Sequence, residues 1–278
     1  MSTMNSPFRW TLSLTVALGV ATSAWAQDSE PLTETETETR TETRTTTVAT
    51  DPMRAHGRIG PEFAVSGNVG LGAGYVYKDG LSSAGTVESL KITDSAKVSI
   101  PVIVEVGFRA TPRFYLGVWG SWEKVFTKEN PLSCPTGFDC STQQWRFGPE
   151  VRYHLSPMGG FDPWIGLGVG LEFLKSHVQG TTQVPVAPGV VVPAEVDTRV
   201  TDKGPTFARL TLGGDIRVTR AFSVGPIITA SIGSYTVRTG TQTLNITGVG
   251  ERPGTLARVD DGFHGLFTVG LRLAILPL

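Results

Sequence analysis

The sequence predicts an all-β fold, namely an eight-stranded antiparallel β-barrel that spans a membrane with short periplasmic turns and long extracellular loops. From Glu62 onward, eight short segments alternate apolar residues with small or polar ones, which is the two-residue period of a strand with two different faces. The connections between the segments are alternately short and long, and aromatic residues gather near the segment ends. Both features are typical of transmembrane barrels.

Bulk composition excludes two other classes of protein. The chain has 278 residues, a formal net charge of -1 and a mean hydropathy of +0.01. After the N-terminal region, no apolar run approaches the roughly 20 residues that a membrane-spanning helix needs, so a polytopic helical membrane protein is excluded. The chain has no dense block of Lys and Arg, so it carries no electrostatic signature of nucleic-acid binding.

The N-terminal residues predict export from the cytoplasm. Arg9 precedes an apolar stretch at 10–20, and Ala24 and Ala26 form a small-x-small cleavage site. Residues 1–26 are therefore interpreted as a signal peptide, with a retained membrane anchor as the alternative. The cleavage site is followed by no cysteine that could carry a lipid anchor at the new N-terminus.

A leader at 27–60 separates the signal peptide from the barrel domain at 61–278. Its tract TETETETRTETRTTT at 33–47 has no apolar residue to bury. This composition predicts a disordered periplasmic segment rich in Thr, Glu and Arg. A tether for a partner or for the cell wall is the alternative interpretation of the same tract.

The first four predicted strands each combine an apolar face with a small or polar one. They comprise residues 63–77, 100–109, 114–123 and 144–155. The first places glycines and Asn68 opposite its apolar residues, and the second places Glu105 and Arg109 opposite valines. The third includes Trp119 on its polar face, and the fourth alternates most regularly of all. A water-soluble sandwich rarely needs so polar an inner face, so the alternation favours a membrane barrel.

The last four predicted strands repeat this pattern. They comprise residues 165–173, 209–218, 222–233 and 263–273. The fifth strand sets glycines and Glu172 against Ile, Leu, Val and Phe, and the sixth sets Arg209 and Asp215 against leucines. The seventh has only small residues on its inner face, and the eighth has His264 and Arg272 there. Each segment therefore has one face suited to lipid and one suited to a lumen.

The connection lengths predict how the barrel is oriented. The short connections are 111–113, 156–163 and 219–221, and the long ones are 78–98, 126–143, 176–205 and 238–262. Barrels of this kind have short periplasmic turns, so both ends of the barrel domain are placed in the periplasm. A ten-stranded barrel, in which 184–200 inserts as another hairpin, is the alternative. Pro185, Pro188 and Pro193 argue against it because proline cannot donate to a strand ladder.

Aromatic residues are expected to mark the two interfaces between lipid and water. On the predicted topology, the periplasmic rim collects Phe63, Phe108, Phe114, Tyr153, Trp164 and Phe222. The outer rim collects Tyr75, Tyr77, Trp122, Trp145, Phe173, Tyr235 and Phe263. A general preference of aromatics for strands explains their presence, but it does not explain their absence from most strand centres.

Three strand segments carry a resemblance to a known family. FYLGVWGSWE at 114–123, PWIGLGVGLEF at 163–173 and GLFTVGLRL at 265–273 resemble strands of the OmpA/OmpX/OmpW-like small outer-membrane β-barrels. The resemblance covers the chain from about Glu62 onward. It implies a monomer in the bacterial outer membrane, inserted by the assembly machinery and surrounded by outer-membrane lipids and lipopolysaccharide.

The predicted inner face carries a nearly balanced set of charges. The acids are Glu105, Glu123, Glu150, Glu172 and Asp215, and the bases are Arg109, Arg146, Arg152, Arg209, Arg217 and Arg272. Eight strands enclose little more space than side chains fill, and a buried charge is costly unless it is paired. We therefore expect a network of ion pairs that plugs the lumen. A narrow passive pore for small solutes is the alternative.

The two cysteines and the four histidines bear on the remaining alternatives. Cys134 and Cys140 lie in one predicted loop, where an oxidising compartment would join them in a disulfide. A metal site is disfavoured because two thiolates do not complete a zinc shell, and no cofactor is expected. His177 and His264 are the histidines expected at the outer rim, the latter near Asp260, Asp261 and Ser234. No catalytic signature accompanies them, so we expect a structural or surface-interaction protein and not a lipid-modifying enzyme or protease.

Overall fold

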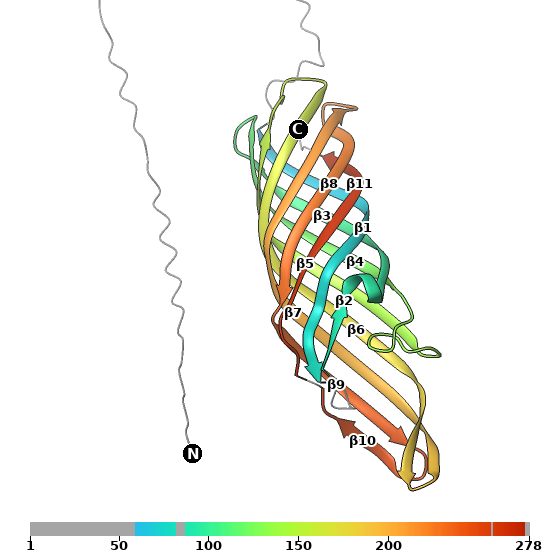
Figure 1. Ribbon diagram of the computed structural model, residues 1–278. Helices are drawn as coiled ribbons and strands as arrows, with labels where there is room; N and C mark the ends of the chain where they lie inside the picture. Colours follow the sequence, from blue (N-terminus) through green and yellow to red (C-terminus); the bar gives the residue numbers. More distant parts are fainter. Residues whose placement is uncertain (1–58, 82–86, 257, 276–278) are drawn as a thin grey trace, which may run out of the picture. The chain divides into compact units, whose positions relative to one another are not determined.

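The computed structural model describes residues 59–81, 87–256 and 258–275, which are almost entirely β-strand (Figure 1). The predicted signal peptide at 1–26 and nearly all of the leader at 27–60 lie outside the described residues. Within the described ranges, no helix is long and apolar enough to cross a membrane.

Eight strands form a closed antiparallel ring. They are β1 (Gly60–Leu81), β3 (Ala96–Arg109), β4 (Phe114–Thr127), β5 (Asp139–His154), β6 (Phe161–Ala187), β7 (Val190–Arg217), β8 (Phe222–Tyr235) and β11 (Gly262–Ile275). Each strand pairs with the next one along the chain, and β11 closes the ring by pairing with both β8 and β1. The eight predicted strands and their antiparallel order are confirmed.

The two faces of the ring have opposite chemistry. In β5, Arg146, Glu150 and Arg152 are at most 4% exposed, whereas Phe147 and Val151 are 49% and 46% exposed. The other ring strands follow the same alternation across the membrane, so charged side chains lie in the lumen and large apolar side chains lie outside. Such an outer surface is stable only against lipid, and a closed ring also satisfies the backbone hydrogen bonds there.

The short turns lie together at one end of the barrel, at the top of Figure 1. Gly60 of β1 and Ile275 of β11 lie at this end as well. In the turn between β3 and β4, the Thr111 hydroxyl accepts hydrogen bonds from the backbone N–H groups of Arg113 and Phe114, at 3.3 and 3.0 Å. This local bonding explains why Thr-Pro-Arg reverses the chain so tightly.

At the opposite end, several strands continue beyond the ring. β9 (Val237–Ile246) pairs with residues 194–203 of β7, and β10 (Gly250–Gly254) pairs with β9. With the far ends of β6 and β7 they form an extramembrane sheet, at the bottom of Figure 1. β2 (Val87–Lys91) pairs with the far end of β1, and α1 (Ile92–Ser95) leads from β2 into β3.

The ten-stranded alternative is wrong because residues 184–200 prolong β6 and β7 and add no strand to the ring. The hairpin reverses at Pro188 and Gly189, where Gly189 has φ +76°, as proline and glycine favour in a type II turn. Pro185 is tolerated in β6 because the pairing of β5 with β6 ends at Gln179, which leaves that edge of β6 without a partner strand.

A charge on the lipid-facing surface tests the placement in the membrane. Val118 is 58% exposed on β4, halfway between the rim residues Phe114 and Trp122. We expect Val118→Arg to lower the free energy of unfolding by roughly 2–4 kcal/mol, because the charge would lie near the bilayer midplane. Denaturant titration of the protein in lipid vesicles, followed by tryptophan fluorescence, measures this loss.

The matched control is Val191→Arg on the extramembrane hairpin, where the valine is 53% exposed. Its cost is expected to stay within about 0.5 kcal/mol, as for most surface substitutions. Similar losses for the two variants would contradict the assignment of the outer face to lipid.

Candidate functional site

Arg152 of β5 lies inside the barrel, near its short-turn end, and contacts three carboxylates. Its Nη1 donates to Glu62 at 2.8 Å, and its Nη2 donates to Glu105 and to Glu150, each at 2.8 Å. Arg152 is 1% exposed, so water does not weaken these charge-assisted hydrogen bonds. The guanidinium therefore joins strands β1, β3 and β5 across the lumen.

Arg272 of β11 reaches into the same group from the other side of the ring. Its Nε donates to Glu105 at 2.7 Å, its Nη1 to Asp215 at 2.9 Å and its Nη2 to Glu62 at 2.6 Å. Arg152 and Arg272 thus share Glu62 and Glu105. The two arginines and four carboxylates link β1, β3, β5, β7 and β11.

Two branches extend this group toward the remaining strands. Arg109 binds Glu62 at 2.9 Å and Asp162 at 3.4 Å, and the Asp162 carboxylate also lies 2.9 Å from His154 Nδ1. On the other side, Arg209 binds Glu150 at 2.7 Å. All of these side chains are buried. These charged residues lie in the half of the barrel nearer the short turns. We call this connected set the lumen network.

A second, smaller cluster lies nearer the loops. Arg146 donates to Glu123 at 2.8 Å and to the Ser231 hydroxyl at 3.1 Å. Glu172 lies 3.0 Å from His264 Nε2, while His264 Nδ1 lies 3.0 Å from the Gly262 carbonyl oxygen. The His264 ring therefore bridges a carboxylate and a backbone carbonyl. Within the described part of the chain, His264 forms no hydrogen bond with Asp260, Asp261 or Ser234, which were its predicted neighbours.

The structure brings together ten of the eleven predicted lumen residues. Glu105, Arg109, Glu123, Arg146, Glu150, Arg152, Glu172, Arg209, Asp215 and Arg272 are all buried in the lumen. Arg217 departs from the prediction, because it lies half-buried at the short-turn end, where it donates to the Pro157 carbonyl. Its position near the end of β7 places it at the lumen mouth.

Sequence reasoning missed Glu62, His154 and Asp162 as members of the lumen network. Glu62 lies one residue before the first predicted strand, and Asp162 was assigned to a predicted turn. Extending the two-residue alternation past those boundaries would have placed both carboxylates on the inner face. His154 was assigned to the inner face, but nothing in the sequence indicated that Asp162 is its partner.

Aromatic rings support the arginines of the lumen network. The Tyr115 and Trp164 rings each lie 4.3 Å from the Arg152 guanidinium, and the Trp119 ring lies 4.5 Å from that of Arg209. Such contacts add a cation–π attraction. The Tyr115 ring lies close against Gly117, where a Cβ atom would come within 2.5 Å of it. The inner glycines therefore make room for these large rings.

Three aromatic residues predicted at the rims lie inside the barrel instead. Trp164 is 2% exposed, because successive residues of a strand point to opposite faces and the adjacent Ile165 faces the lipid. Tyr235 is 6% exposed, because it continues the inward-facing series of Ser231 and Gly233 in β8. Tyr77 lies beyond Gly74, whose φ of +94° marks a local irregularity in β1.

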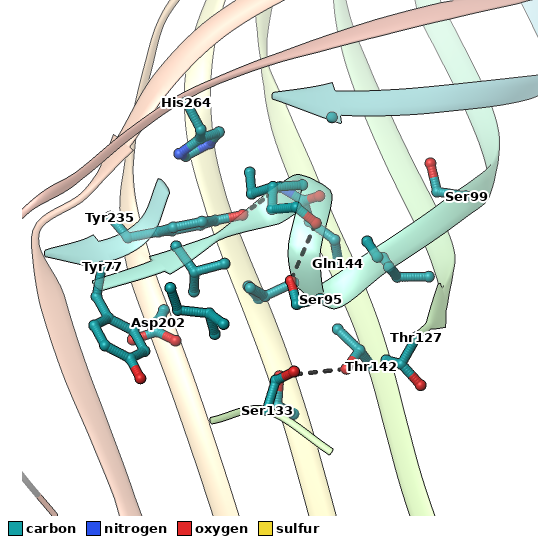
Figure 2. Close-up of a pocket in the computed structure, with 18 of the residues that line it drawn as sticks. Tyr77, Ser95, Ser99, Thr127, Ser133, Thr142, Gln144, Asp202, Tyr235 and His264 are labelled. Atoms are coloured by element: carbon teal, nitrogen blue, oxygen red, sulfur yellow. Dashed lines mark hydrogen bonds between the residues drawn. The ribbon is translucent and has the colours of Figure 1, made fainter. Parts of the chain in front are cut away.

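Above the second cluster lies a cavity of about 480 Å³ that we call the vestibule (Figure 2). Its apolar walls include Val76, Leu90, Ile92 and Leu174, and polar groups of Gln144, Tyr235 and His264 lie at its base. Figure 2 shows the Tyr235 ring between His264 and Gln144. The ring stacks on His264 at 4.2 Å, and its hydroxyl accepts a hydrogen bond from Gln144 at 2.9 Å.

Two loops complete the wall of the vestibule. Leu132 and Ser133 line it from the loop that precedes β5, and the predicted disulfide between Cys134 and Cys140 is confirmed in this loop. The backbone N–H of Lys128 donates to the Ser95 carbonyl of α1 at 2.8 Å. Loop and helix are thereby held together on one side of the vestibule.

An ion pair closes the other side. Arg238 donates from Nε to Asp202 at 2.6 Å, and its guanidinium lies 4.3 Å from the Tyr77 ring. Asp202 lies opposite Leu174, and Leu174 is the residue that follows the rim residue Phe173 toward the loops. Burial raises the pKa of the Asp202 carboxyl, and the adjacent Arg238 opposes this shift. Outside the ring, His177 Nε2 lies 3.1 Å from Asp197 on the extramembrane sheet.

Sequence comparison finds no matching family model and no matching curated protein. Among solved structures, the chain is similar to Neisserial surface protein A, with 14% identity, 77% of this chain and 97% of that chain covered, and a TM-score of 0.36. For the outer membrane protein OprG from Pseudomonas aeruginosa, the identity is 10%, the coverage is 80% and 99%, and the TM-score is 0.42.

A third similar structure is the outer membrane protein AlkL in lipid bilayers, with 9% identity, 81% and 93% of the two chains covered, and a TM-score of 0.39. All three are small outer-membrane β-barrels, the group that the strand segments resemble. The fold itself is established by the closed ring of eight strands.

Removing one arginine tests the energetic role of the lumen network. We expect Arg152→Met to lower the free energy of unfolding by about 3–5 kcal/mol, because it removes one ion pair from each of three buried carboxylates and leaves their negative charge uncompensated. Denaturant unfolding in vesicles measures the loss. The control is Arg199→Met, whose side chain is 67% exposed beside Asp197 and whose loss should cost at most about 1 kcal/mol. Equal effects of the two substitutions would refute a structural role for the network.

Proposed function

We propose that this protein is a monomeric outer-membrane β-barrel with a closed lumen and a structural or surface-interaction role, inserted by the outer-membrane assembly machinery. The observation that carries the proposal is the lumen network. Its side chains come from β1, β3, β5, β6, β7 and β11 and contact one another inside the ring. An eight-stranded barrel has little further space to fill.

Passage of a solute through this half of the barrel would require several ion pairs to separate. Arg152 and Arg272 each contact three different carboxylates, and these carboxylates are shared. Moving one guanidinium aside would break three buried ion pairs at once and leave uncompensated negative charge in the lumen, which is strongly unfavourable. The geometry therefore supports a plug more than a narrow passive pore.

The loop end offers the surfaces on which an interaction would occur. The vestibule lies between the loops and the closed half of the lumen, and it has the volume of a small-molecule site. The hairpin of β6 and β7 carries exposed apolar side chains near its tip, at Val186, Val190 and Val191. Both features face the side away from the short turns.

Planar-bilayer recording of the refolded full chain tests the closed lumen. We expect no stable conductance from the native protein, and frequent openings from the double variant Arg152→Ala and Arg272→Ala, which removes both central side chains. Circular dichroism and heat-modifiable gel migration must show that the variant still forms a barrel. A stable, reproducible pore in the native protein would instead establish the passive-pore alternative.

We further propose that the protein is not an enzyme. The support is that the two histidines nearest the outer rim contact acids or a carbonyl: His264 contacts Glu172 and Gly262, and His177 contacts Asp197. Neither arrangement activates a serine nucleophile. On overexpression, we expect unchanged lipid A mass spectra and unchanged outer-membrane protein patterns. A new lipid A species or cleavage product that disappears in His264→Ala would overturn this proposal.

A further inference from the structure

Three lysines lie in two adjacent cross-strand rows on the outer surface of the barrel. Lys203 lies directly opposite Phe173, in the same cross-strand row as Trp145 and Trp122. One row nearer the loops, Lys124 lies opposite Gln143, which lies opposite Lys175. We call Lys124, Lys175 and Lys203 the lysine row.

The alternation of the strands points all three lysines outward. Lys124 follows the lipid-facing Trp122 by two residues, and Lys175 follows Phe173 by two. Lys124 and Lys175 are exposed, and Lys203 is half-buried. The lysine row thus borders the outer aromatic rim, where the hydrocarbon region gives way to lipid headgroups.

The positive charge of the lysine row has no counter-charge from the described part of the chain. No described carboxylate forms an ion pair with any of the three lysines. Their neighbours on the outward face are the uncharged Gln143, Thr201 and Thr239. Asp197 lies farther up the sheet and is already bound to His177 and Arg199.

At the level of this group, most of the other ring strands present apolar residues outward. These residues include Ile100 of β3, Leu71 of β1, Phe263 of β11 and Ile232 of β8, which are all exposed and apolar. Two further exposed lysines, Lys78 and Lys91, lie apart from the group, beside Tyr75 on β1 and β2. A uniform ring of lysines would indicate general solubility at the interface. A group on β4, β6 and β7, within four consecutive strands of the ring, indicates instead a local site for an anion.

We propose that the lysine row binds the phosphate groups of a phosphorylated lipid in the outer leaflet. Lys124 and Lys175 lie two strands apart, or about 10 Å from the spacing of strands in a sheet. They can therefore contact separate phosphates of one headgroup. The acyl chains would lie below, against Trp122, Trp145 and the apolar band. Clusters of basic residues beside a membrane bind anionic lipids in this way.

This inference rests on the proposed outer-membrane location and does not depend on a closed lumen. Conductance plays no part in the experiment below, so a failure of the lipid site and a failure of the plugged lumen can be told apart.

The experiment compares lipid binding by the full chain and by charge variants. The protein is refolded in phosphatidylcholine vesicles that contain bis-phosphorylated lipid A, dephosphorylated lipid A or neither. Native mass spectrometry then counts the lipid A molecules that remain bound. The triple variant Lys124→Gln, Lys175→Gln and Lys203→Gln is expected to bind bis-phosphorylated lipid A on the order of 100-fold more weakly, because each lysine near the surface contributes to anion attraction.

Two further variants make the comparison specific. The control Lys78→Gln, Lys91→Gln and Arg252→Gln removes the same charge from β1, β2 and β10, and it should bind as the native protein does. The variant Lys124→Arg, Lys175→Arg and Lys203→Arg keeps the charge and should also bind. All variants must unfold like the native protein in phosphatidylcholine alone.

Three outcomes would overturn the proposal. The first is equal loss of binding in the glutamine triple and in the control. The second is equal binding of the dephosphorylated lipid. The third is binding of inorganic phosphate alone with the same dependence on the lysine row, which would identify an anion site that is not specific for lipid.

Discussion

The pairing of charges inside a narrow lumen is the constraint on which the rest of this barrel depends. A guanidinium or carboxylate in a space without bulk water is unfavourable unless its partner is in contact. Arg152 and Arg272 satisfy this requirement by sharing Glu62 and Glu105, so each strand that contributes a charge fixes the position of others. The glycines and aromatic rings of the inner face follow from the same requirement, because they give the arginines both space and a surface to lie on.

The outer surface and the lumen impose opposite demands on every strand, and this is why much of the fold could be predicted from the sequence. One face must suit lipid and the other must suit paired charges, so the alternation in 144–155 or 263–273 admits few other structures. The strand order then follows from the short turns. The same reasoning assigned ten buried charges to the lumen, but it could not match acids to bases. Partners such as Arg272 and Asp215 are set by the stagger of the whole ring, which no local pattern encodes.

The errors of prediction lie where the two-residue period is broken or its limits are misjudged. Tyr77 follows an irregularity in β1, where Gly74 has a positive φ and the pairing with β2 shifts register. Tyr235 was assigned to a rim because it is aromatic, although it shares the parity of the inward Ser231 and Gly233. Trp164 was assigned to a rim because it is aromatic, although its own parity directs it inward. The length of β6 and β7 beyond the ring was underestimated for a different reason. Proline excludes a residue from a ladder only on the side where its N–H is needed, and an edge strand lacks that demand.

The length of β6 and β7 has a consequence for any molecule that meets this protein from outside. Their pairing runs from Phe161 opposite Ile216 to Ala187 opposite Val190, with only two local shifts of register. The wall of the barrel therefore continues beyond the ring as a paired β-hairpin. When a partner binds the tip of this hairpin, the hairpin loses little conformational freedom, because it is already ordered. This low cost favours affinity. Because the hairpin is continuous with two strands of the ring, a pull at the tip would act directly on the strands held in the membrane.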